Sequence, residues 1–99
     1  MNPDLLARLW ARRAHKSIRE RLPQGGWRLA GDDTVVYDDT TFQYPYNGRE
    51  GVVFILHRDG TVEYEEYWNS SYWNGWVISP SGESSFYGDN PCARDNQYV

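Results

Sequence analysis

The sequence contains little cysteine, little histidine and no long apolar run. There is one cysteine, Cys92, and there are two histidines, His15 and His57, among 99 residues. A single cysteine excludes a disulfide within the chain, and these three side chains lack the spacing of metal ligands. We therefore expect no metal and no cofactor. Because no signal sequence or membrane-spanning run is recognisable, the sequence predicts a cytoplasmic protein that is not held in a membrane.

The sequence also lacks the motifs of common catalytic sites. Cys92 has no histidine near it in the sequence, no serine occupies a nucleophile elbow, and no glycine-rich loop joins a strand to a helix. Adjacent acids such as Asp38 and Asp39 point to opposite faces of a strand. Only Glu63 and Glu65 share a face, about 7 Å apart, which is a spacing that acid–base pairs use. We expect a protein that is not an enzyme, with a small hydrolase-type site at these two glutamates as an alternative.

Aromatic residues are abundant instead, with 5 Trp, 8 Tyr and 3 Phe. Each buries roughly 150–250 Å², so these rings can build a small core that has few aliphatic residues. The same residue types are enriched at binding interfaces, so their number alone does not separate core from binding surface. The length of 99 residues predicts a single domain with one modest core.

The formal net charge of −4 conceals two regions of opposite charge. Residues 1–23 carry six Lys and Arg against two acids, whereas residues 24–99 carry four against twelve. The sequence thus predicts a basic head on an acidic body. Because the acidic body would repel nucleic acid at long range, we expect no direct nucleic-acid contact. It favours a partner protein with a basic surface, since complementary charge raises association rates.

Residues 3–22 predict one amphipathic helix. Asn2 can cap it, Pro3 suits its first position, and Pro23 with the glycines that follow ends it. Apolar residues recur at every fourth position: Leu6, Trp10, Ala14, Ile18 and Leu22. We expect this stripe to pack on a sheet and the basic residues on the other side to lie in solvent. Contacts of the basic side with nucleic-acid phosphates, an anionic membrane or a partner protein are the alternatives.

A β-hairpin is the centre of the predicted sheet. Asp59-Gly60 is a strong signal for a two-residue type I′ turn, in which both residues have positive φ. Residues 52–56 are apolar without interruption, which predicts a central strand that is covered on both faces. Residues 61–65 alternate instead, so Glu63 and Glu65 point away from the core.

Five further short strands are expected, at residues 27–30, 34–37, 40–46, 72–78 and 83–87. Asp38-Asp39 is expected to end the second of them, and Gly75 to make the fourth irregular. Pro45 is expected to hold the third at an edge or to end it early. Residues 88–99 are predicted to be a polar tail. The predicted fold class is α+β in one domain, 1–99, with an N-terminal amphipathic helix in 1–23 packed on a curved, mostly antiparallel sheet of about six or seven short strands in 27–87. A half-open barrel is the alternative.

The most unusual local composition lies in residues 67–76, where five aromatic residues are separated only by Asn, Ser and Gly. Large rigid rings among small polar residues are typical of recognition surfaces, because such rings lose little entropy on binding. The predicted partner-binding residues are Glu63, Glu65, Tyr67, Trp68, Tyr72, Trp73 and Trp76. A core role for most of the rings, or a stacking platform for a glycan or nucleotide, is the alternative.

These patterns favour a non-enzymatic protein-binding module that occludes a partner. A basic partner surface that binds nucleic acid would be covered by acids that stand in for phosphates. Such a module would be a small inhibitor of a nucleic-acid-handling or defence protein, or an immunity protein. The alternative function is a small-ligand or carbohydrate binder that uses the aromatic patch.

Overall fold

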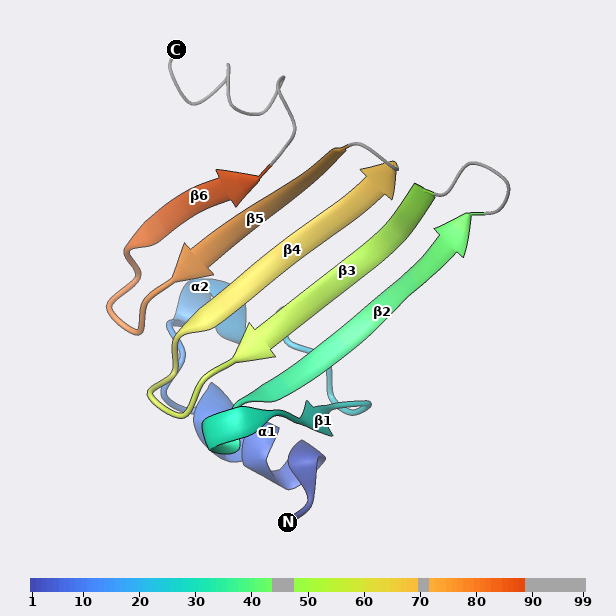
Figure 1. The fold of residues 1–99 in the computed structure, drawn as a ribbon. Coiled ribbons are helices and arrows are strands. Elements are labelled where there is room, and N and C mark those ends of the chain that lie inside the picture. The colour runs from blue at the N-terminus through green and yellow to red at the C-terminus, as the bar shows by residue number, and fades with distance from the viewer. Residues whose placement is uncertain (44–47, 70–71, 89–99) are drawn as a thin grey trace.

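The sheet is a six-stranded antiparallel meander in which each strand pairs with the next one along the chain (Figure 1). The computed structural model describes residues 1–43, 48–69 and 72–88. The strands are β1 (Arg28–Leu29), β2 (Val35–Gln43), β3 (Gly48–Leu56), β4 (Val62–Asn69), β5 (Tyr72–Ile78) and β6 (Ser84–Gly88). β1 and β6 are edges, so the sheet stays open and the half-open barrel is not formed. The predicted α+β class and antiparallel pairing are confirmed.

Two short helices, α1 (Pro3–Ala11) and α2 (Lys16–Arg19), lie behind the sheet at the end where the β3–β4 and β5–β6 loops lie (Figure 1). The Oδ1 atom of Asn2 accepts the backbone N–H of Asp4 at 2.9 Å, so the predicted cap of α1 is confirmed. The prediction of one helix up to residue 22 is wrong, because α1 ends at Ala11 and His15 caps a second helix through its Nδ1 atom. The apolar stripe nevertheless faces the core on both sides of the break.

The helical segment breaks because residues 12–15 cross the ends of two hairpins. A Cβ atom on Gly60 would clash with the backbone of Arg13, and one on Gly82 would lie 2.7 Å from the His15 ring. Arg13 also donates from Nη1 to the Arg58 carbonyl oxygen at 2.8 Å. A continuous helix would carry this segment away from the loops, so contacts from distant parts of the chain end α1.

Both of these loops use a glycine in the left-handed region. His57 N–H donates to the Thr61 carbonyl at 2.9 Å, and only Gly60 between them has positive φ, at 95°. Residues 79–83 repeat this pattern with Gly82, also at 95°. The predicted type I′ turn is therefore wrong, because the hairpin has a three-residue loop that closes with a glycine bulge.

The expected strand break at Asp38-Asp39 is also wrong, because β2 continues through both residues. Asp38 pairs across the strands with Arg49 of β3 at 3.1 Å, which gives its carboxylate a partner within the sheet. Gly75 keeps the register of β5, and the irregularity lies between Tyr67 and Asn69 instead. The predictions for Pro45 and for residues 89–99 of the tail lie outside the described residues.

A row of aromatic rings crosses the sheet on the face that the helices cover. The rings are Trp27, Tyr37, Phe54, Tyr64, Trp76 and Phe86, and the centroids of consecutive rings lie 4.8–6.3 Å apart. Ile18 and Leu22 from the helical segment join this row with Leu56 and Val62, which lie deepest in the sheet. Aromatic rings therefore supply much of the core, as the shortage of aliphatic residues predicts.

Replacing Phe54 by alanine should cost about 3–5 kcal/mol of the free energy of unfolding. Phe54 is 5% exposed and its ring lies between those of Tyr37 and Tyr64, so the change opens a cavity in the row. Phe42→Ala is the matched control, because Phe42 is 77% exposed and should lose less than about 0.5 kcal/mol. Denaturant unfolding of both variants measures the difference, and equal losses would place the core elsewhere.

Replacing Gly60 by alanine should destabilise the fold by at least about 1–2 kcal/mol, because a left-handed backbone disfavours a side chain. The added Cβ would also push on the Arg13 backbone and so displace the connection between the helices. Gly31→Ala is the control, since no atom lies within 4 Å of a Cβ there. If thermal melts showed the two variants to be equally stable, the contact between Gly60 and the Arg13 backbone would not be the reason that α1 ends at Ala11.

Candidate binding surface on the open face of the sheet

The face of the sheet opposite the helices, here called the open face, carries no helix among the described residues (Figure 1). Side chains alternate along each strand and register partners share a face, so core residues such as Phe54 and Tyr64 identify the opposite set. The residues on the open face include Asp38, Thr40, Phe42, Arg49, Glu63, Glu65, Tyr67, Trp73, Gly75 and Tyr87.

Glu65 is the centre of an interlocked group on this face, here called the Glu65 cluster (Glu65, Tyr67, Trp73 and Tyr87). Its Oε1 accepts the hydroxyl of Tyr67 at 2.9 Å, and its Oε2 accepts that of Tyr87 at 3.1 Å. The Tyr67 ring stacks on Trp73 with centroids 5.9 Å apart and planes at 17°. Trp73 also meets the Tyr87 ring edge-on at 5.4 Å. The rings and the carboxylate thus hold one another in place.

Gly75 makes the contact between Tyr87 and Glu65 possible. In the sheet register Gly75 lies between these two residues, as the β5 partner of both. A Cβ atom on Gly75 would clash with the Tyr87 ring, so that ring lies flat over the glycine and reaches across β5. Tyr87 was not among the predicted site residues. A glycine inside a strand, facing an aromatic residue of the next strand, is the signal that could have found it.

Arg49 extends the cluster toward β2. Its guanidinium carbon lies 4.3 Å from the centroid of the Tyr67 ring, its Nη2 lies 3.1 Å from Asp38 and its Nε donates to Thr40 at 3.0 Å. Cation–π contact and the ion pair together fix the orientation of Tyr67, although an ion pair that is one-third exposed contributes at most about 1 kcal/mol. Arg49 was not among the predicted site residues, because its partners lie on two other strands.

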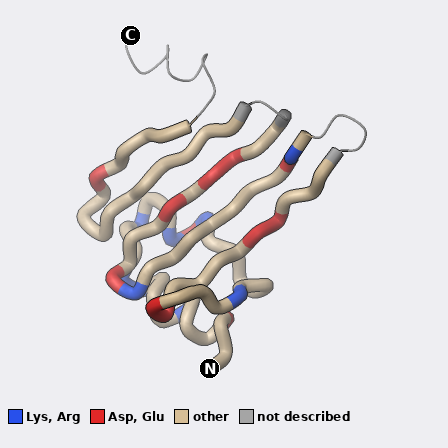
Figure 2. Tube along the Cα trace, viewed as in Figure 1, with Lys and Arg blue, Asp and Glu red and all other residues tan. Residues whose placement is uncertain are grey.

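The open face is acidic. Asp38, Glu63 and Glu65 lie on this face with Arg49 and with Arg28, which is the register partner of Val36. Glu63 pairs with the neighbouring His57, with 2.6 Å between Oε2 and Nε2. Figure 2 shows acidic positions along β2 and β4, while Lys and Arg gather in the helical segment behind the sheet. The basic residues of the N-terminal segment thus lie behind the sheet, whereas acids lie along β2 and β4.

The structure brings only part of the predicted surface together. Glu63, Glu65, Tyr67 and Trp73 share the open face. Trp68 and Trp76 lie on the opposite face, where Trp76 packs between Tyr64 and Phe86 while Trp68 is 42% exposed. The side chain of Tyr72 lies outside what the structure describes. The predicted continuous surface is split because residues 67–76 are two paired strands with a short connection, and alternation separates their side chains.

Burial and Glu65 set the protonation of the two tyrosines in the cluster. Burial is the largest cause, and the hydrogen bond to Glu65 and its negative charge add to it, which together raise the pKa of Tyr67 to about 12. The pKa of Tyr87 is raised further by burial and by the same carboxylate. Both hydroxyls therefore stay protonated at neutral pH and act as fixed donors. This arrangement suits recognition by a rigid surface, and it offers no ionised nucleophile.

Two cavities lie on the helix side of the molecule and neither includes Glu63 or Glu65. One, of about 380 Å³, lies between α2 and the sheet and is lined by Arg21, Tyr64, Glu66 and Trp76 among others. The other, of about 310 Å³, lies between the helices and the segment that leads to β1. Within the described ranges, no group of three or more His, Cys, Asp or Glu is placed to hold a metal ion.

The chain matches no protein-family model, no curated protein and no solved structure. None of the helices in the described part of the chain is both long and apolar enough to cross a membrane.

Stability should fall as the pH rises from about 10 to about 12. Unfolded tyrosines ionise near pH 10, whereas Tyr67 and Tyr64 keep their protons to about pH 12, so the folded state binds more protons than the unfolded state in this window. Replacing Glu65 by glutamine should lower the pKa of Tyr67 and Tyr87. Glu66→Gln is the control and should lower only that of Tyr64. Titration followed by the absorbance of tyrosinate measures the tyrosine pKa values in both variants. An unchanged titration in Glu65→Gln would contradict the hydrogen bonds of Tyr67 and Tyr87 to Glu65.

Proposed function

We propose that this protein is a binding module, not an enzyme, and that its open face covers a basic surface of a partner protein. The observation that carries the proposal is the Glu65 cluster, in which stacked rings and a carboxylate are held rigidly on a sheet face that no described helix covers. Rigid aromatic side chains give contact area at a low cost in conformational entropy. Cytoplasmic location is part of the proposal, from the single cysteine.

Charge supports a basic partner. The acids of the open face would steer such a partner toward it, and the arginines behind the sheet would repel the same partner from the other side. Phe42 at the end of β2 adds an aromatic ring that is 77% exposed on the open face. If the partner uses its basic surface to bind nucleic acid, occupation by this face would block that activity. That is the action of an inhibitor or an immunity protein.

Catalysis by Glu63 and Glu65 has less support, because the two carboxylates are engaged by different partners. Glu63 pairs with His57, while both oxygens of Glu65 accept tyrosine hydroxyls. A small-ligand or carbohydrate binder is the second candidate. It is supported by the cavity of about 380 Å³, where Trp76 and Tyr64 stack at 5.6 Å beside Glu66 and Arg21. Stacked rings with polar groups at their edge suit a sugar or another small ring.

Trp73→Ala should raise the dissociation rate of the partner about 30-fold, which corresponds to the 2 kcal/mol typical of a central aromatic contact. The partner is first captured from extracts of the native host with the immobilised protein, then purified for surface plasmon resonance. Trp68→Ala is the matched control, because this exposed tryptophan lies on the opposite face of the same hairpin. A loss of binding in Trp68→Ala but not in Trp73→Ala would move the contact to the other face.

The acids should act on association. Glu63→Gln with Glu65→Gln should lower the association rate and weaken its dependence on salt, since rim charges mainly steer the encounter. Asp32→Asn with Glu83→Gln removes the same charge from two exposed loop positions and should have a smaller effect. Circular dichroism must show that every variant is folded. Unchanged association rates in the glutamate pair would argue against a basic partner.

A further inference from the structure

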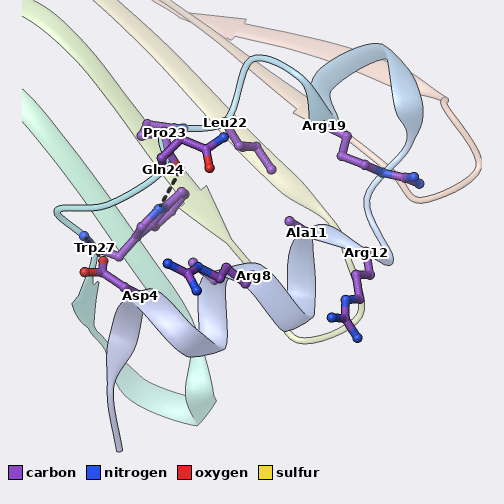
Figure 3. A pocket seen from close by; sticks show the side chains of 10 residues that line it. Asp4, Arg8, Ala11, Arg12, Arg19, Leu22, Pro23, Gln24 and Trp27 are labelled. Carbon is purple, nitrogen blue, oxygen red and sulfur yellow. Dashed lines mark hydrogen bonds between the residues drawn. The ribbon is translucent and has the colours of Figure 1, made fainter.

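The cavity of about 310 Å³ on the helix side is lined by three arginines and has an apolar wall. Arg8 and Arg12 of the N-terminal segment and Arg19 of α2 surround it, and Ala11, Leu22, Pro23 and Trp27 form much of the wall. Figure 3 shows Arg8 extending toward Trp27, while Arg12 and Arg19 lie at the other side of the opening with their guanidinium groups pointing outward. Its volume is at the lower end of the range for small-ligand sites.

These arginines are not neutralised by the acids of their own chain. No ion pair joins Arg8, Arg12 or Arg19 to a carboxylate in the part of the chain that the structure describes. Arg19 donates from Nε and Nη2 to the Ala14 carbonyl, at 3.2 and 2.7 Å, and these two bonds hold its side chain in place. The N–H groups of its Nη1 atom make no described hydrogen bond. The guanidinium groups of Arg8 and Arg12 therefore have donors that a ligand in this cavity can use.

One acid lies in the wall. Asp4 lines the cavity, and its Oδ1 accepts the backbone N–H of Trp27 at 2.9 Å. The carboxylate thus holds the segment that leads to β1 against α1, and Trp27 closes the same side through its indole N–H, which donates to the Pro23 carbonyl at 3.1 Å. Three positive charges against one negative charge leave the cavity cationic. Hydrogen bonds of Asp4 and Trp27 therefore fix the shape of this cavity.

The chemistry of these groups identifies the ligand class. Guanidinium groups bind phosphate oxygens through paired, charge-assisted hydrogen bonds, and three of them suit a dianion better than a single carboxylate. The wall of Leu22, Pro23 and Ala11 suits an apolar or aromatic group attached to that phosphate. We propose that this cavity binds a small organic phosphate ester with its organic part against the apolar wall. Arg8 holds the phosphate, and the exposed side chains of Arg12 and Arg19 turn inward to join it when the ligand binds. The site is separate from the open face and does not depend on it.

Isothermal titration calorimetry with phenyl phosphate tests this site in the full chain. We expect saturable binding at one site per chain, and weaker binding of inorganic phosphate, which lacks the ring. The double change Arg8→Gln with Arg12→Gln should raise the dissociation constant of phenyl phosphate by about tenfold or more, because a hydrogen bond to a charged group contributes about that factor to the affinity. Both side chains are exposed and make no described bond, so the variant should melt as the wild type does.

Two control variants separate a built cavity from diffuse positive charge. Lys16→Gln removes a charge from α2 without touching the cavity wall and should leave the affinity unchanged. Gln24→Trp keeps every charge but narrows the opening of the cavity. It should lower the affinity for phenyl phosphate, as the two arginine changes do. Equal weakening by Lys16→Gln, no effect of Gln24→Trp, or the absence of saturation would overturn the proposal. Binding of a DNA duplex without binding of phenyl phosphate would overturn it too, in favour of a nucleic-acid contact.

Discussion

The row of aromatic rings that crosses the sheet is the interaction on which the rest of the structure depends. Each contact in it joins neighbouring strands, so burial of one row fixes the register of the whole meander. The helical segment is short and can cover only this row and the lower end of the sheet. Phe54 and Tyr64 at the middle of the row therefore decide which face is core, and the alternation of the strands leaves the other face open.

On the open face, polar groups and rings hold one another without a helix above them. Glu65 can lie among aromatic side chains because two tyrosine hydroxyls satisfy its oxygens, and Gly75 provides the space through which Tyr87 reaches it. Burial, together with the hydrogen bonds to Glu65 and its negative charge, raises the pKa of both tyrosines above the ordinary value. A rigid, acidic and aromatic surface of this kind is suited to binding a partner, which is why the proposed function rests on it.

The distribution of charge gives the molecule two chemically different sides. Asp38, Glu63 and Glu65 lie on the open face, while arginines of the N-terminal segment and α2 line a cavity on the other side (Figure 3). The chain could have paired these charges internally, but the described ion pairs involve Asp38, Glu63 and Asp33 and none of the cavity arginines. The two proposed sites thus take ligands of opposite charge and can be tested independently.

Local periodicity by itself determined most of the strands, the cap of α1, the apolar stripe of the helical segment, and the outward direction of Glu63 and Glu65. These features depend on residues within a few positions of one another, and the stripe survives even where the helix does not. Only the tertiary structure decided where α1 ends, because the backbone of Arg13 meets Gly60 across 47 positions of the sequence. It also decided that Asp38 of β2 forms an ion pair with Arg49 of β3. In the same way it placed Trp68 and Trp73 on opposite faces of the sheet and brought Tyr87 to Glu65. Those outcomes follow from contacts between strands, which sequence spacing along one segment does not contain.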